Sequence, residues 1–198
     1  IIRVQLSPND YIRVLSNGRR HGKDYPVLSA FKAKTTDYVL FVSNVGKVYA
    51  VRANRLPETS GKGESLRKLL ALGANEHVVG AFPTAGFDQD RYLVQFTSMG
   101  RVKKSSLYEY RSADEKGLAD LNLQNGDQIQ SIALSSGSGH YLVVASDGKT
   151  LRFSDDDLRA SGRVGIGVQA INLANGSSVI YGCSLTGEKD GRYLVTLS

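Results

Sequence analysis

The sequence predicts an all-β protein arranged as a propeller-like array of four-stranded blades. A tyrosine-led strand recurs about every 50 residues, and a glycine turn and a second short strand follow it. No long stretch shows the 3.6-residue periodicity of an amphipathic helix. A unit of that length holds about four short strands, which is the size of a propeller blade. The 198 residues therefore accommodate roughly four repeats.

The first anchor of the repeat is the tyrosine-led strand. Its four copies occupy residues 37–42, 91–96, 140–145 and 192–197. The tyrosines of successive copies are 54, 49 and 52 residues apart. Gly46, Gly100 and Gly148 follow the first three copies, and each precedes a second short run. A strand, a glycine turn and a return strand predict a β-hairpin in each repeat.

A second anchor recurs at the same step. Short apolar runs end at Leu72, Leu123 and Leu173, which are 51 and 50 residues apart. A polar turn and another apolar stretch follow each run and predict a further strand per repeat. We expect one domain over residues 1–198, with repeat units at 1–36 (partial), 37–90, 91–139, 140–191 and 192–198 (partial).

Composition narrows the class of function. The net charge of +6 and the pI near 9.4 favour an anionic partner, and residues 1–50 alone hold eight Lys/Arg against three Asp. A single cysteine, Cys183, excludes a disulfide framework and a four-cysteine zinc site. No apolar run approaches the ~18 residues that a membrane helix needs. The chain does not begin with methionine, and we expect it to be part of a longer protein.

The motifs in this sequence that suggest an enzyme are incomplete. Residues 147–150 resemble the end of a phosphate-binding P-loop, but the earlier glycine that the loop needs is replaced by Val143. The glycines of residues 162–167 have no βαβ pattern around them, so they predict no dinucleotide site. The three histidines lack the spacing of metal ligands. We expect no catalytic residue, no metal site and no cofactor in this domain.

Several segments resemble one repeat of a known family. They are residues 37–49 (DYVLFVSNVGKVY) with 56–58 and 61–63, residues 100–107 (GRVKKSSL), and residues 162–163 with 167–173 (GVQAINL). In this order and at this period they resemble the C-terminal domain of the bacterial type IIA topoisomerase A subunit, in DNA gyrase or topoisomerase IV. The resemblance covers roughly residues 35–198.

The resemblance implies a β-pinwheel, a propeller-shaped disc in which neighbouring blades exchange strands. It implies a non-catalytic accessory domain of an ATP-dependent type II DNA topoisomerase. Such a domain binds and bends or wraps duplex DNA on a basic outer rim, without sequence specificity, and presents it to the cleavage core during supercoiling, relaxation or decatenation. The implied partners are double-stranded DNA, the rest of the A subunit and, through these, the ATPase subunit, with no membrane. The implied location is the cytoplasm, in association with the nucleoid.

Sequence-independent binding needs Lys and Arg side chains that neutralise phosphates along a convex surface. The candidate phosphate contacts are Arg13, Arg19, Arg20, Lys23, Lys47, Arg101, Lys103, Lys104, Lys149, Arg152 and Arg163. Three of them directly follow the turn glycines. Lys103 and Lys104 are consecutive in a predicted strand, so they point to opposite faces and we expect only one of them to meet phosphate. Arg152 aligns with Lys104 in the next repeat.

Two questions stay open at this point. Gyrase domains carry the basic box Gln-Arg-Arg-Gly-Gly-Arg-Gly, and the nearest candidate here is the degenerate segment 18–23 (GRRHGK). The sequence therefore leaves both a gyrase and a topoisomerase IV parent possible. A propeller that serves as a protein-interaction scaffold is the alternative function; it predicts a rim poor in basic residues and a large apolar patch on the top face.

Overall fold

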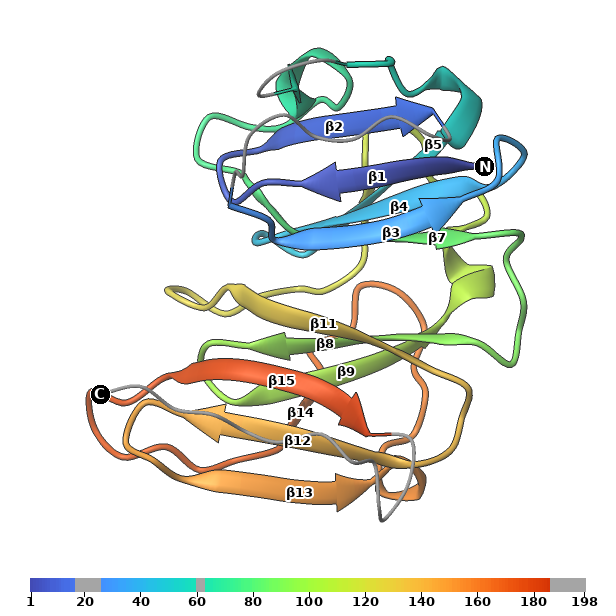
Figure 1. The fold of residues 1–198 in the computed structure, drawn as a ribbon. Coiled ribbons are helices and arrows are strands. Elements are labelled where there is room, and N and C mark those ends of the chain that lie inside the picture. Colours follow the sequence, from blue (N-terminus) through green and yellow to red (C-terminus); the bar gives the residue numbers. More distant parts are fainter. Residues whose placement is uncertain (17–25, 60–62, 186–198) are drawn as a thin grey trace.

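The computed structural model describes residues 1–16, 26–59 and 63–185, and all its sheets are antiparallel (Figure 1). The first sheet has the order β3 (Ser29–Ala33), β1 (Ile2–Leu6), β2 (Tyr11–Ser16), β6 (Glu64–Ser65). The second has the order β10 (Leu118–Ala119), β5 (Lys47–Arg52), β4 (Tyr38–Ser43), β7 (Val78–Thr84). The third has the order β11 (Ile129–Ser135), β8 (Tyr92–Thr97), β9 (Arg101–Ser106), β14 (Val168–Gln169). Among the described residues the fourth is β13 (Thr150–Ser154), β12 (His140–Ala145), β15 (Val179–Leu185).

The helical content of the described residues is confined to four short 3₁₀ helices. They are η1 (Ala53–Arg55), η2 (Leu66–Lys68), η3 (Leu107–Tyr110) and η4 (Asp155–Asp157). None of the helices in this part of the chain is long and apolar enough to span a membrane. The prediction of an all-β fold is confirmed.

The hairpins predicted from the glycine turns are present. β4 pairs with β5, β8 with β9 and β12 with β13. The turn glycines Gly46, Gly100 and Gly148 have φ angles of 79°, 84° and 84°, a left-handed conformation that glycine adopts without a steric penalty. The β1–β2 hairpin has Asp10 at its turn, with φ 57°, in place of glycine. That substitution explains why the first hairpin does not stand out in the repeat pattern.

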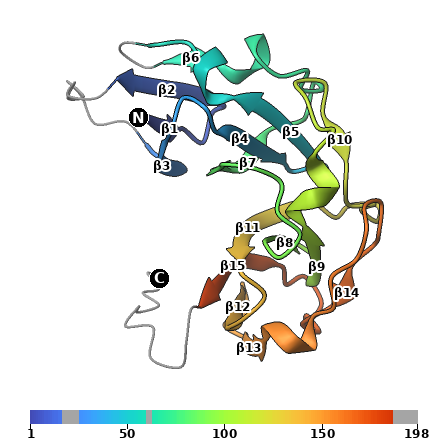
Figure 2. The same cartoon turned by 90° about the vertical axis from the view of Figure 1, so that its right-hand side faces the viewer.

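Neighbouring sheets exchange strands. β6, β10 and β14 each follow the hairpin of one sheet in the chain but pair with the preceding sheet. Leu118 of β10 pairs with Val48, and Val168 of β14 pairs in the same way with Val102. These short strands form the outer edges of the first three sheets (Figure 2). The arrangement is the β-pinwheel that the resemblance implies.

The sheets follow one another along an arc, with β3, β7, β11 and β15 on its concave side (Figure 2). Among the residues that the structure describes, the hydrophobic core is divided into three clusters, one between each pair of consecutive sheets. Side chains alternate between the two faces of a strand, so a central strand contributes residues to the core clusters on both sides of its sheet. Leu93 of β8, for example, packs toward the second sheet, and Val94 packs toward the fourth.

Candidate nucleic-acid interface

Exposed basic residues lie beside each outer-edge strand. Arg67 and Lys68 follow β6, Lys116 precedes β10, and Arg159 and Arg163 precede β14. All five are exposed. Of the four inner strands, β7, β11 and β15 contain no lysine or arginine, whereas β3 contains the exposed Lys32. The exchanged strands therefore place positive charge on the convex side of the arc.

The surface as a whole is more basic than the interior. In the described part of the chain, thirteen Lys/Arg are exposed against seven Asp/Glu. Four carboxylates, Asp10, Glu76, Asp120 and Asp155, are buried there. The exposed cations are Arg3, Lys32, Lys34, Arg52, Arg55, Arg67, Lys68, Arg111, Lys116, Lys149, Arg152, Arg159 and Arg163.

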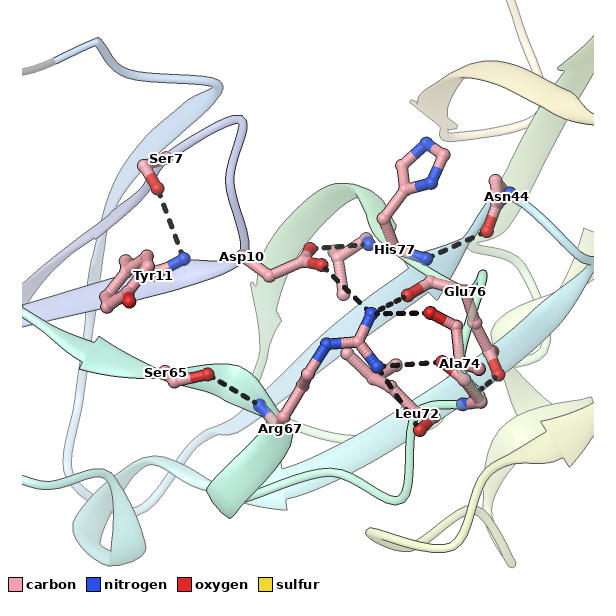
Figure 3. Close-up of polar contacts among 12 residues, drawn as sticks. Ser7, Asp10, Tyr11, Asn44, Ser65, Arg67, Leu72, Ala74, Glu76 and His77 are labelled. Carbon is pink, nitrogen blue, oxygen red and sulfur yellow. Dashed lines mark hydrogen bonds and ion pairs between the residues drawn. The ribbon is translucent and has the colours of Figure 1, made fainter.

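Arg67 joins the first sheet to the second (Figure 3). Its guanidinium donates hydrogen bonds to the carbonyl oxygens of Gly73, at 2.7 Å, and Glu76, at 2.6 Å. Its Nη2 also lies 4.0 Å from Asp10 Oδ2, while Asp10 Oδ1 accepts a 2.8 Å hydrogen bond from the Val78 amide. The donors of Arg67 are thus used to fix the loop before β7, although the side chain remains partly exposed.

Lys103, expected to be a candidate phosphate contact, is buried. Its Nζ lies 2.7 Å from Asp120 Oδ1 and also donates to Ser105 Oγ. Tyr110 donates a 2.9 Å hydrogen bond to the other oxygen of Asp120. Burial and the Asp120 charge raise the pKa of Tyr110 well above its ordinary value. Lys103 therefore neutralises an internal carboxylate between the second and third sheets, and its assignment to the DNA surface is wrong.

Lys104 points to the opposite face of β9, as strand alternation predicts, but it is buried too. Its Nζ contacts the carboxylate of Asp155 in η4, which also accepts hydrogen bonds from Tyr141 and Ser135. Burial raises the pKa of Asp155, but the hydrogen bonds from these three side chains outweigh burial and lower it overall. The assignment of Lys104 to DNA is likewise wrong, because the following sheet covers it.

Three other candidates are partly or wholly engaged within the protein. Arg13 is only 4% exposed on β2, which contradicts its assignment to the rim. Arg101 is half-buried and donates 2.8 Å hydrogen bonds to the carbonyl oxygens of Ile166 and Gly167. Lys47 is 40% exposed, and its Nζ lies 3.5 Å from Glu76 Oε2.

Glu76 illustrates how the interior holds a carboxylate beside these cations. Tyr49 donates a 2.7 Å hydrogen bond to its Oε1, and the Gly73 amide donates to its Oε2 at 3.0 Å. Burial raises the pKa of Glu76, but hydrogen bonds from Ser43, Gly73 and Tyr49 and the charge of Lys47 lower it overall. Tyr49 occupies the position in β5 that Lys103 occupies in β9. Each of the two side chains contacts a buried carboxylate, Glu76 for Tyr49 and Asp120 for Lys103.

The remaining candidates fall into two groups. Lys149, Arg152 and Arg163 are exposed, with Arg163 Nε 4.0 Å from Glu109 Oε2. Arg152 aligns with Lys104 but is exposed, because among the described residues no further sheet packs on that face of β13. Arg19, Arg20 and Lys23 lie outside the described residues.

Several exposed rim residues were not predicted from the sequence. Lys68, Lys116 and Arg159 stand next to the exchanged strands, where no repeated basic motif marks them. The signal that could have found them is position: Lys68, Lys116 and Arg159 lie 1, 5 and 12 residues before the second anchor of their repeats. Within the described ranges, no group of three His, Cys, Asp or Glu side chains is arranged to hold a metal ion.

Comparison with known proteins agrees with this geometry. The family model "DNA gyrase C-terminal domain, beta-propeller" matches residues 37–85, 91–136 and 140–181. The DNA gyrase A subunit of Salmonella typhimurium is 33% identical over 150 residues, which are 75% of this chain and 17% of that protein. Its counterpart in Deinococcus deserti is 34% identical over 149 residues, or 74% and 18% of the two chains. The chain thus spans less than a fifth of the length of these relatives.

Solved structures share the fold. The C-terminal domain of DNA topoisomerase IV superposes with a TM-score of 0.83 at 24% identity, covering 93% of this chain and 61% of that one. The DNA gyrase A C-terminal domain superposes with a TM-score of 0.72 at 20% identity, covering 93% and 64%. Because the family model matches most of the residues and the exchanged-strand sheets are present, the chain belongs to the DNA gyrase C-terminal domain family of β-propeller domains.

Proposed function

We propose that this domain binds duplex DNA along its convex outer edge, without sequence specificity. The observation that carries the proposal is the placement of exposed cations beside β6, β10 and β14. On the concave side β7, β11 and β15 have none, and β3 has Lys32. Lys and Arg at such positions neutralise phosphates and release counterions, which supplies affinity for any duplex sequence. A path across three successive outer edges requires the duplex to bend.

The bend has an elastic cost that these contacts must offset. Bending a 20–30 bp site by 40–90° costs roughly 1–6 kcal/mol. The buried Lys103 and Lys104 do not contribute to that offset, so the rim charge is smaller than the sequence implied. We therefore expect bending of the duplex rather than a complete wrap.

We infer that the domain is part of a type II topoisomerase A subunit; the relatives, which are A subunits of DNA gyrase, support this. In that setting the bent duplex is presented to the cleavage core of the same subunit during supercoiling, relaxation or decatenation. The catalytic groups lie elsewhere in the enzyme, which works with an ATPase subunit in the cytoplasm, at the nucleoid. The alternative function, a protein-interaction scaffold, predicts a rim poor in basic residues and a large apolar patch on the top face. The basic outer edge of this domain is the opposite of the first of these two predictions.

The proposal is tested by duplex binding across a salt series. Lys68→Gln, Lys116→Gln and Arg159→Gln together remove one cation beside each exchanged strand. The slope of log K against log salt should fall by about 0.9 for each phosphate that is no longer neutralised. Lys32→Gln on the inner strand β3 is the matched control and should leave the slope unchanged. Equal slopes for the triple variant and the wild type would remove the outer edge from the interface.

A further inference from the structure

We propose that residues 159–168 form a mixed apolar and cationic contact with DNA, here called the β14 rim segment. In this contact Val164 and Ile166 pack against the deoxyribose edges of the duplex, while Arg159 and Arg163 meet the flanking phosphates. The inference rests on the proposed function and adds to it a component of affinity that does not depend on salt.

The β14 rim segment presents apolar side chains to solvent in an unusual concentration. Val164 is 59% exposed, Ile166 51% and Val168 53%. A recess beside them is lined by Leu158, Arg159 and Gly167 among others. Large apolar side chains that gather at one exposed place indicate a contact surface more often than single ones do.

The segment is held rigidly across two sheets. The Val164 amide donates a 2.6 Å hydrogen bond to the Asp120 carbonyl, and the Asn122 amide donates to the Gly165 carbonyl at 3.0 Å. On the other side, Arg101 holds the carbonyl oxygens of Ile166 and Gly167. A surface fixed in this way loses little conformational entropy when it binds.

The backbone at Val164 is in the left-handed region, with φ 61°. That conformation is rare for a β-branched residue, and such outliers concentrate at functional sites. The strain is not required by the fold. Aligning Gly117 with Gly167, both of positive φ, places Asp114 and Lys116 at the equivalent positions on the preceding outer edge. Asp114 does not share the positive φ of Val164. The preceding outer edge therefore forms with polar residues and without a left-handed residue at this position, and the apolar pair needs another explanation.

The charges around the segment favour DNA over an apolar protein partner. Arg159 and Arg163 belong to the segment, and Arg101 contacts it. The one ion pair that the described residues form with these three arginines is the 4.0 Å contact of Arg163 with Glu109. A duplex backbone offers phosphates alternating with apolar sugar faces, which matches arginines flanking apolar side chains. Phosphate contacts release counterions, whereas apolar contacts do not, so the two contributions separate in a salt series.

The test compares two variants of the 198-residue protein on one linear duplex. Val164→Asn combined with Ile166→Ser removes the apolar surface, and asparagine accepts the left-handed backbone. This variant should bind roughly three- to ten-fold more weakly at every salt concentration, with an unchanged slope, as expected when two apolar side chains are removed from an interface. Arg159→Gln combined with Arg163→Gln should instead lower the slope by about 0.9 for each phosphate left without its arginine.

Controls separate the possible failures. Val45→Asn removes an exposed apolar side chain from the β4–β5 turn and should change nothing. Circular dichroism melting checks folding, and Ile166→Ser alone, which leaves the Val164 backbone untouched, replaces the double variant if that one melts early. Wild-type affinity in the apolar variant would overturn the inference and point to a protein partner for this surface, as would weaker binding confined to low salt. Absence of wild-type binding would instead defeat the proposed function itself.

Discussion

Lys103 Nζ lies 2.7 Å from Asp120 Oδ1, and both side chains are completely shielded from solvent. Lys103 belongs to β9 of the third sheet, and Asp120 directly follows β10, the strand that the same repeat unit donates to the second sheet. The pair therefore ties the third sheet to the exchanged segment, by which we mean β10 and the residues that directly follow it, 118–121. Tyr110 satisfies the other carboxylate oxygen, so the acid is paired on both sides.

Replacing Lys103 by methionine should destabilise the fold strongly. The change leaves Asp120 buried without a counter-ion, and breaking a buried pair in this way costs about 3–5 kcal/mol in the free energy of unfolding. Urea denaturation followed by circular dichroism measures the loss. The double variant Lys103→Met with Asp120→Leu should recover part of it, because it removes both charges. A single variant as stable as the wild type would show that the pair does not hold the exchanged segment.

Stability should depend on pH through Asp155. Its pKa in the fold is lowered, so the carboxylate stabilises the native state above the unfolded pKa of about 3.9 and loses that contribution as pH falls through the folded value. Asp155→Asn removes the charge at every pH. The difference in unfolding free energy between wild type and variant should therefore be largest above about pH 5 and shrink below about pH 4. A difference that stays constant from about pH 7 to about pH 3 would contradict the role given to the Asp155 charge.

The turn glycines should respond unequally to alanine. A Cβ at Gly46 would lie 2.4 Å from the Leu121 carbonyl oxygen of the exchanged segment, whereas a Cβ at Gly148 would meet nothing within 4 Å. Both residues have positive φ, so each substitution carries a backbone penalty of roughly 1–2 kcal/mol. Gly46→Ala should lower the melting temperature clearly more than Gly148→Ala does, because the backbone of Leu121 must move. Equal costs would indicate that the exchanged segment does not pack on this turn.

The basic cluster at Arg19, Arg20 and Lys23 lies outside the described residues, so its role stays a prediction. Replacing all three by glutamine should weaken duplex binding and reduce the salt slope by about 0.9 for each phosphate that the cluster neutralises. Lys149→Gln, at an exposed turn beside Asp147, is a comparison in which a single charge is removed. If the triple variant keeps the wild-type slope, the cluster is not part of the interface.

The sequence was sufficient for the hairpins, because their signals are local. Turn glycines with positive φ, flanked by apolar strands, specify a hairpin whatever surrounds them. The β1–β2 hairpin lacks this sequence signal, since Asp10 stands where the other hairpins have glycine. The Asp10 carboxylate contacts the Val78 amide and the Arg67 guanidinium, which are distant in the sequence. The family resemblance added the exchange of strands, which two-residue strands such as β10 and β14 could not have revealed by themselves.

By itself the sequence determined the all-β class, the repeat of about 50 residues, the net positive charge and the opposite directions of Lys103 and Lys104. Only the tertiary structure decided what each of these two side chains contacts. Strand alternation places two lysines on two faces, but whether a face meets water or another sheet depends on packing between residues far apart in the chain. Here both faces of β9 are covered, and each lysine meets a carboxylate, Asp120 or Asp155. Five of the basic residues that remain exposed lie beside the exchanged strands, where no further strand of the described chain covers the outer edge of a sheet: Arg67, Lys68, Lys116, Arg159 and Arg163.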